Sequence, residues 1–318
     1  MVIPSSLDYQ LAMSQKIATF YKFLTLDPIP LQSQLLSACQ TLALKGTLLL
    51  APEGINATLS GLPEKLDQFL TDLRRDSRFA DLTVKYAFTD RTPFDRLKVK
   101  IKSEIVTLGR PDINPAEQSG IYVTPQDWNA LIKAEPDLVI IDTRKSFEIS
   151  TGSFEGAVDP KISSFRQFPT YVKTHLDPQQ HTKIAMFCTG GIRCEKASAY
   201  LLNQGFETVY HLQGGILKYL EETPPEDSLW QGECFVFDQR TAVQPGPKDG
   251  GIEDSGIRDG SFTTCLACGD PVSPEDQAKP QYQIGLTCPH CHDRLVPEQH
   301  QSNQERLKQR HLALERSD

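Results

Sequence analysis

Apolar and polar positions alternate in two different ways along the first hundred or so residues. Strand-like spacing occurs in TFYKFL, LTVKYAF and RLKVKIK, and we expect two more strands around the Pro-Glu-Gly turn of GTLLLAPEGINATLSG. Helical spacing occurs from Leu31 to Leu44, where Gly46 is a suitable helix end, and in LPEKLDQFLTDLRRD. The resulting β-α-β-β-α-β order predicts a ferredoxin-like α+β domain over residues 15–110.

The segment 109–123 is rich in Pro, Gly and polar residues and predicts a linker. The chain after it has a different pattern of apolar residues. The strands DLVIID, KIAMF and TVYHL are almost wholly apolar and alternate with helical stretches. Such strands are typical of a parallel sheet that is covered on both faces. Thr124 and Pro125 suit a helix N-cap and first helical position. We therefore predict an α/β parallel-sheet domain over residues 124–222.

The remaining chain contains two CxxC pairs with 19 residues between them, namely Cys265 with Cys268 and Cys288 with Cys291. Each pair can present two thiolates from one turn, and two pairs complete a tetrahedral zinc shell. With four sulfur ligands no coordination position stays open, so the zinc would be structural. This spacing predicts a small zinc-binding segment within residues 230–295.

Two further stretches of the C-terminal part are poor in apolar residues. Residues 240–262 predict a flexible loop. Residues 296–318 are charged and predict a tail that forms an exposed helix.

Composition indicates an uneven distribution of charge along the chain and the cellular compartment to expect. The net charge is −8, yet residues 1–110 carry 14 Lys/Arg against 11 Asp/Glu, while the remainder carries 19 against 30. No apolar run approaches the roughly 18 residues that span a bilayer, and the first residues lack the features of a signal peptide. We expect a cytoplasmic protein with reduced thiols. Its eight cysteines are then catalytic, metal-binding or inert.

The basic excess includes a lysine row on the predicted strand RLKVKIK. Lys98, Lys100 and Lys102 alternate there with apolar residues, so they share one face of the strand. A row of this kind is either a solvated sheet face or a set of contacts to nucleic-acid phosphates. It is the best candidate in the chain for phosphate contact.

The segment CTGGIRCEK carries the strongest chemical signal, because it joins the apolar strand KIAMF to a helical pattern. Cys188 sits at the end of the strand, two glycines allow the backbone N–H groups to turn inward, and Arg193 adds a positive charge. A helix N-terminus adds partial positive charge, and the whole lowers the pKa of a thiol. An inert buried cysteine is the alternative. The pattern favours a nucleophilic thiolate, and the predicted nest consists of Cys188, Thr189, Gly190, Gly191, Ile192, Arg193 and Cys194.

Loop length separates two possible thiolate chemistries. Thiol phosphatases place five residues between cysteine and arginine, whereas four separate Cys188 from Arg193. The position that a phosphatase needs as arginine is Cys194, so phosphatase activity is disfavoured. Cys194 itself is either a residue that resolves an oxidised Cys188 or a packing residue at the helix start.

Several charged residues near the thiol allow both structural and functional interpretations. Asp142 and Arg144 end the strand DLVIID, and with Glu148 they are predicted to support the site as structural ion partners. Lys196 either holds an anionic substrate or lies on a solvated helix face. The turn from Glu53 to Asn56 has hairpin chemistry and is a further candidate for the border of the site.

Three ordered motifs in the second domain resemble those of the rhodanese (sulfurtransferase) family. The stretch Ile141–Pro160 is similar to its first signature, although Ser153 replaces the usual histidine. The stretch His211–Leu220 is similar to its closing signature. The resemblance implies that Cys188 is the persulfide-forming cysteine and Arg193 the arginine of its loop.

The combination of LLLAPEGINATLSG, CTGGIRCEKASAYL and the paired CxxC motifs resembles, more narrowly, the bacterial tRNA uridine hydroxylases that carry a rhodanese domain. This resemblance implies conversion of wobble uridine 34 to 5-hydroxyuridine with molecular oxygen. The expected partner is tRNA, through its anticodon loop, rather than DNA or a membrane, and the oligomeric state stays unassigned. No flavin or haem motif is visible in the sequence. A plain sulfurtransferase and a non-catalytic rhodanese-fold binding module are the rival interpretations.

Overall fold

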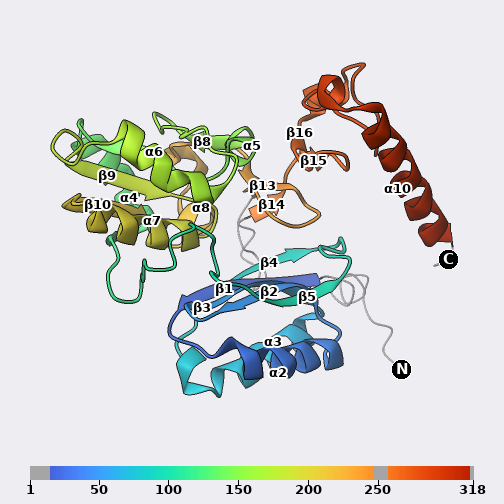
Figure 1. The fold of residues 1–318 in the computed structure, drawn as a ribbon, viewed down its shortest axis with the longest axis horizontal. Helices are drawn as coiled ribbons and strands as arrows, with labels where there is room; N and C mark the ends of the chain where they lie inside the picture. Colours follow the sequence, from blue (N-terminus) through green and yellow to red (C-terminus); the bar gives the residue numbers. More distant parts are fainter. Residues whose placement is uncertain (1–14, 247–256, 316–318) are drawn as a thin grey trace.

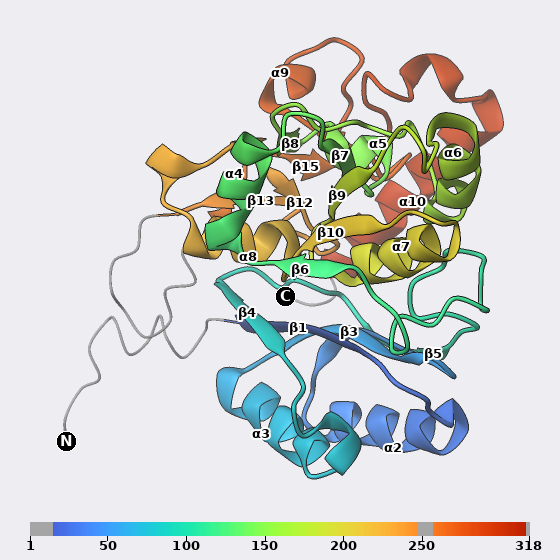
Figure 2. The same ribbon diagram turned by 90° about the vertical axis from the view of Figure 1, so that its left-hand side faces the viewer.

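The computed structural model describes residues 15–246 and 257–315 of the chain (Figure 1). Its first part is a sheet with the strand order β4-β1-β3-β2-β5, in which β5 runs parallel to β2 and the other pairs are antiparallel. Helices α2 (Pro28–Thr41) and α3 (Pro63–Arg74) cover one face of this sheet (Figures 1 and 2). The elements are β1 (Gln15–Phe23), α2 (Pro28–Thr41), β2 (Lys45–Ala51), β3 (Gly54–Gly61), α3 (Pro63–Arg74), β4 (Val84–Thr89) and β5 (Leu97–Ile101). The predicted ferredoxin-like α+β order is confirmed, with β5 added at the edge.

Period-two alternation decides what each sheet face presents. Ala18 and Phe20 pack into the core under α2 and α3, which leaves Tyr21 on the opposite, open face. Lys85 of β4 pairs with Thr19 of β1 and therefore shares that open face. The open face is the one turned toward the second domain (Figure 2).

The predicted role of Gly46 is wrong, because α2 ends at Thr41 and Gly46 lies inside β2. Its φ is +126°, and a Cβ there would approach the carbonyl oxygen of Thr58 to 2.2 Å. Only glycine tolerates this combination of a positive φ and a close backbone approach. Gly46 thus serves the pairing of β2 with β3 rather than the end of a helix.

The second domain is built on a parallel sheet, as predicted, and its strand order is β6-β10-β9-β7. Adjacent residues of the central strand β9 enter two different cores: Ile184 and Met186 pack with α6 and α7, while Ala185 and Phe187 pack with α4 and α8. The elements are β6 (Ile121–Val123), α4 (Pro125–Ala134), β7 (Val139–Asp142), α5 (Ser146–Ile149), β8 (Gly152–Phe154), α6 (Phe168–His175), β9 (Lys183–Phe187), α7 (Ile192–Asn203), β10 (Thr208–Leu212) and α8 (Gly215–Glu222).

Helix α4 begins as the sequence indicates. Thr124 is its N-cap, and the hydroxyl of Thr124 accepts a hydrogen bond from the backbone N–H of Asp127 at 3.2 Å. The segment predicted as a linker packs closely onto the protein instead of spanning a gap. Ile113 of this segment is buried in the core beneath α6 and α7, as is Leu108 just before it, and strand β6 (Ile121–Val123) lies at the end of the segment.

The C-terminal part consists of short strands and a long helix. Strand β11 pairs with β8 of the second domain, and β12, β13 and β14 form a small sheet. The elements are β11 (Trp230–Gly232), β12 (Cys234–Phe235), β13 (Ala242–Pro245), β14 (Ile257–Asp259), β15 (Thr263–Thr264), β16 (Pro271–Val272), α9 (Pro274–Gln277) and α10 (Pro297–Glu315).

The predicted flexible loop 240–262 is partly wrong, since β13 and β14 pair with each other inside it. Its middle, residues 247–256, lies outside the described residues. The expected helix of the charged tail is present as α10. Within the described ranges no helix has the length and apolar character to cross a membrane.

Candidate active site

Cys188 lies where the central strand β9 gives way to α7, at the carboxyl end of the parallel sheet. The backbone N–H of Gly191 donates to the Cys188 Sγ at 3.1 Å. Gly191 has a φ of +102°, and a Cβ at this position would lie 2.8 Å from the hydroxyl of Tyr21. Gly191 therefore permits both the inward turn of the loop and the approach of the first domain.

Opposing effects set the protonation of Cys188, which is fully buried. Burial acts to raise the pKa of the thiol, because it disfavours the charged form. A hydrogen bond from the Cys194 thiol, the charge of Arg193 and the N–H groups of Gly191 and Arg193 outweigh it. The pKa of Cys188 therefore lies well below its ordinary value, which favours the thiolate form.

The neighbouring Cys194 has the opposite character. Burial, together with the anion on Cys188, raises the pKa of Cys194 well above its ordinary value. Its sulfur lies 3.5 Å from the hydroxyl of Thr143 and is completely buried. Cys194 thus acts on Cys188 as a hydrogen-bond donor while it keeps its own proton.

The first three carbonyl groups of the Cys188 loop, those of Cys188, Thr189 and Gly190, each accept a hydrogen bond from a donor outside the loop. Two of these donors are the first N–H groups of α8: Ile216 donates to the Cys188 oxygen at 2.9 Å, and Leu217 to the Thr189 oxygen at 3.1 Å. A third is the ammonium group of Lys85, which donates to the Gly190 oxygen. Since a trans peptide places its C=O and N–H on opposite sides, the Gly190 carbonyl held by Lys85 leaves the Gly191 N–H turned toward the sulfur.

Two buried ion pairs lie behind the loop. Arg193 binds both carboxylate oxygens of Glu148, each at 2.8 Å, and Arg144 binds Asp142 at 2.6 Å. Ser153, which replaces the usual histidine, donates to the same Asp142 at 2.9 Å. Arg144 and Asp142 are completely buried, so they hold the strand end and the following turn. These contacts place Asp142, Arg144 and Glu148 around the loop as structural ion partners.

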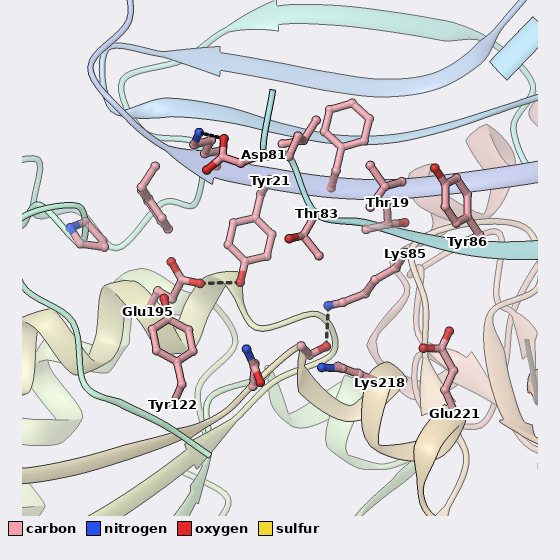
Figure 3. A pocket seen from close by; sticks show the side chains of 18 of the residues that line it. Thr19, Tyr21, Asp81, Thr83, Lys85, Tyr86, Tyr122, Glu195, Lys218 and Glu221 are labelled. Atoms are coloured by element: carbon pink, nitrogen blue, oxygen red, sulfur yellow. Dashed lines mark hydrogen bonds and ion pairs between the residues drawn. The ribbon is translucent and has the colours of Figure 1, made fainter. Parts of the chain in front are cut away.

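The first domain contributes directly to the surroundings of the loop. Tyr21 of β1 donates to Glu195 of α7 at 2.7 Å (Figure 3). Lys85 of β4 donates to the Gly190 and Gly214 oxygens, each at 2.5 Å. Burial lowers the pKa of Lys85 to about 8, although the negative charges of Cys188, Glu221 and Glu195 oppose this. Sequence reasoning missed Tyr21 and Lys85, because neither belongs to a motif and both lie far from Cys188 along the chain.

A cleft of about 730 Å³ opens between the two domains beside this contact (Figure 3). Its lining includes the side chains of Lys16, Tyr21, Lys22, Lys85, Tyr122, Glu195 and Lys218. Burial raises the pKa of Glu195 despite hydrogen bonds from Tyr21 and Tyr122. Cys188 does not line the cleft, because Tyr21 and Lys85 lie over its loop.

Both interpretations of Lys196 are wrong. Its side chain is fully buried and forms ion pairs with Glu53 and, at 2.7 Å, with Glu104. Glu53 comes from the turn between β2 and β3, and its carboxylate also accepts the N–H of Ile105 at 2.7 Å. The turn that we considered as a border of the site therefore anchors the interdomain segment onto α7.

Lys98 and Lys100 of the lysine row lie on β5 and Lys102 directly follows it, while the apolar residues Leu97 and Val99 of β5 pack toward the helices. Lys98 lines a second hollow of about 470 Å³, together with Arg91 and Arg96. Lys100 and Lys102 are exposed beyond it. The row is thus on the open face of the sheet, but it is separate from the cleft beside Cys188.

The four cysteines of the CxxC pairs come together in the C-terminal part. The sulfur atoms of Cys265, Cys268, Cys288 and Cys291 all lie within 4.8 Å of one another. The shorter separations are 3.7 Å to 3.9 Å, close to the roughly 3.8 Å edge of a tetrahedron whose metal–sulfur bonds are about 2.3 Å. His290 and His292 bind Asp276 and Asp293 instead. The cluster can hold a metal ion with four sulfur ligands.

Comparison with known proteins agrees with this architecture. Residues 15–105 match the family model described as UPF0176 acylphosphatase like domain, and residues 124–222 match that of the rhodanese-like domain. Among solved structures, a thiosulfate sulfurtransferase from Pseudomonas aeruginosa is 25% identical, with a TM-score of 0.28 over 33% of this chain and 19% of that one. A rhodanese-like domain from Anabaena sp. is 21% identical, with a TM-score of 0.29 over 35% of this chain and 78% of that one.

One curated relative extends over nearly the whole molecule. A tRNA uridine(34) hydroxylase from Picosynechococcus sp. is 48% identical over 295 residues, which are 92% of this chain and 95% of that protein. The chain belongs to the tRNA uridine(34) hydroxylase family.

Proposed function

We propose that this protein hydroxylates the wobble uridine of tRNA, at position 34, to 5-hydroxyuridine with molecular oxygen as co-substrate. The observation that carries the proposal is the 48% identity to a tRNA uridine(34) hydroxylase over nearly the full length of both chains. The Cys188 loop supports it, because a cysteine anion held by inward N–H groups suits thiolate or persulfide chemistry. The substrate, tRNA, fits action in the cytoplasm.

The cleft between the domains is the place where we put the target base. A nucleotide of an anticodon loop is unpaired, so its base can leave the stack and rest on aromatic side chains. Tyr21 and Tyr122 line the cleft, and Lys22 and Lys218 can meet phosphates there. Because Cys188 is buried and Tyr21 lies against its loop, a base reaches the sulfur only when the contact of Tyr21 with Gly191 and Glu195 opens.

Mass spectrometry of tRNA nucleosides from cells that lack the gene tests the function. Loss of 5-hydroxyuridine and its derivatives, restored by the intact chain, supports the hydroxylase. The rhodanese-like loop also favours sulfur transfer as the second candidate, and loss of 2-thiouridine would identify it. Unchanged nucleosides would leave only a binding role and would refute both enzymatic assignments.

The lysine row is proposed to bind tRNA phosphates outside the cleft. Replacing Lys98, Lys100 and Lys102 with alanine should weaken tRNA binding and reduce the slope of log K against log salt concentration by about 2. Filter binding over a series of salt concentrations measures this slope. The matched control removes the exposed Lys65, Lys133 and Lys173, and it should leave the slope near that of the unmodified protein. Equal slopes for both variants would exclude the row from the interface.

The four-cysteine cluster is proposed to hold one structural zinc ion. Elemental analysis of the purified protein should give about one zinc per chain. The variant Cys288→Ser should lose most of this zinc, while Cys39→Ala, which removes a cysteine of the first domain's core, should retain it. Purified protein without any zinc would contradict the assignment.

A further inference from the structure

The peptide between Gly190 and Gly191 joins the two glycines of the Cys188 loop. Its N–H donates to the Cys188 sulfur at 3.1 Å, and its carbonyl oxygen points to the other side. Neither glycine has a Cβ, so the sequence itself does little to prevent this peptide from turning over. A turned peptide would aim a carbonyl dipole at the sulfur anion in place of an N–H group.

The group that holds this peptide comes from the first domain. Lys85 donates to the Gly190 oxygen at 2.5 Å and to the Gly214 oxygen at 2.5 Å, so one ammonium group joins the Cys188 loop to the turn before α8. The preceding two carbonyls of the loop are bound by α8, which belongs to the same domain as Cys188. The Gly190 carbonyl, by contrast, is bound by a side chain from β4 of the first domain.

We infer that Lys85 is a positioning residue for Cys188: it fixes the Gly190–Gly191 peptide with its N–H toward the sulfur, so the first domain completes the active site. Only the identity of the reaction that Lys85 would assist rests on the proposed function. The contacts of Lys85 with the Gly190 oxygen and of the Gly191 N–H with the sulfur do not depend on which reaction Cys188 performs. The alternative role of Lys85 is a simple phosphate contact, since its side chain also lines the cleft.

The test measures the pH dependence of Cys188 alkylation in the full-length protein. Trypsin cleaves after Lys183 and Arg193, so the peptide Ile184–Arg193 contains Cys188 and no other cysteine. Mass spectrometry of this peptide after brief exposure to iodoacetamide gives the rate at each pH. The midpoint of the rate against pH reports the pKa of Cys188, while the plateau reports access to it.

Lys85→Met keeps the length of the side chain and removes the donors. We expect its alkylation midpoint to move to higher pH, because the anion loses an aligned N–H donor and a nearby cation. We expect kcat for tRNA hydroxylation to fall about tenfold with KM changed less than about threefold. Lys85→Arg, which retains donors and charge, should recover part of both properties. Lys45→Met, at an exposed position of the same sheet, should match the unmodified protein in both measurements.

The outcomes separate the two roles and the two proposals. A raised KM with an unmoved midpoint would make Lys85 a phosphate contact and would overturn the positioning role. A moved midpoint in a protein that never hydroxylates tRNA would support the role of Lys85 and refute the proposed function. Far-ultraviolet circular dichroism of each variant confirms that the comparison is between folded proteins.

Discussion

Replacing Cys188 with serine should lower tRNA hydroxylation by about a thousandfold or more, with little change in fold. A serine hydroxyl stays protonated near neutral pH, so the N–H groups and Arg193 that hold the sulfur anion would have no anion to stabilise. The buried volume changes little between the two side chains. The measurement is the amount of 5-hydroxyuridine formed by purified protein, and in complemented cells that lack the gene.

The matched control for this variant is Cys39→Ala, which removes another buried cysteine in the core of the first domain. It should hydroxylate tRNA at nearly the normal rate, since Cys39 lies among apolar side chains under α2 and α3. Hydroxylation at the normal rate by the Cys188 variant would exclude the sulfur from the reaction. Comparison with Cys194→Ser then tells whether the second sulfur shares the role, because equal losses indicate a shared one.

Replacing Lys196 with alanine should give a large loss of stability, about 3–5 kcal/mol. The change leaves the carboxylates of Glu53 and Glu104 without their buried cation in the contact between the domains. Their side chains are 12% and 3% exposed, so water cannot replace the ammonium group without opening this contact. Urea unfolding followed by tryptophan fluorescence measures the effect, because Trp128 and Trp230 both lie in the second domain's core.

The control for this loss is Lys183→Ala, which removes a cation from a more exposed pair with Glu135. Its unfolding midpoint should stay close to that of the unmodified protein, because exposed pairs contribute little. A second variant distinguishes the lost charge from the lost side chain: Lys196→Met combined with Glu53→Gln and Glu104→Gln should recover much of the stability. A midpoint for Lys196→Ala equal to that of the control would refute the anchoring role.

The sequence alone determined the parts of this protein that depend on neighbours along the chain. The Cys188 loop could be predicted because strand, glycine pair, arginine and helix start are contiguous, and their geometry follows from local backbone chemistry. The same holds for the α+β and parallel-sheet patterns, and for the N-cap at Thr124. The two CxxC turns could also be recognised from their spacing in the sequence, although only the fold brings their four sulfur atoms together.

Tertiary structure alone decided which distant side chains reach the loop. Lys85 and Gly190 are 105 positions apart, and Tyr21 and Glu195 are 174 apart, so no periodicity or motif links them. The same limit explains Lys196. The helical pattern allows a solvated position for it, and only the folded chain shows its ion pairs with Glu53 and Glu104. Hydrophobic spacing shows which face of an element is buried, but not which face of another domain will cover it. The contact between domains, and with it the access to Cys188, is therefore a property of the folded chain.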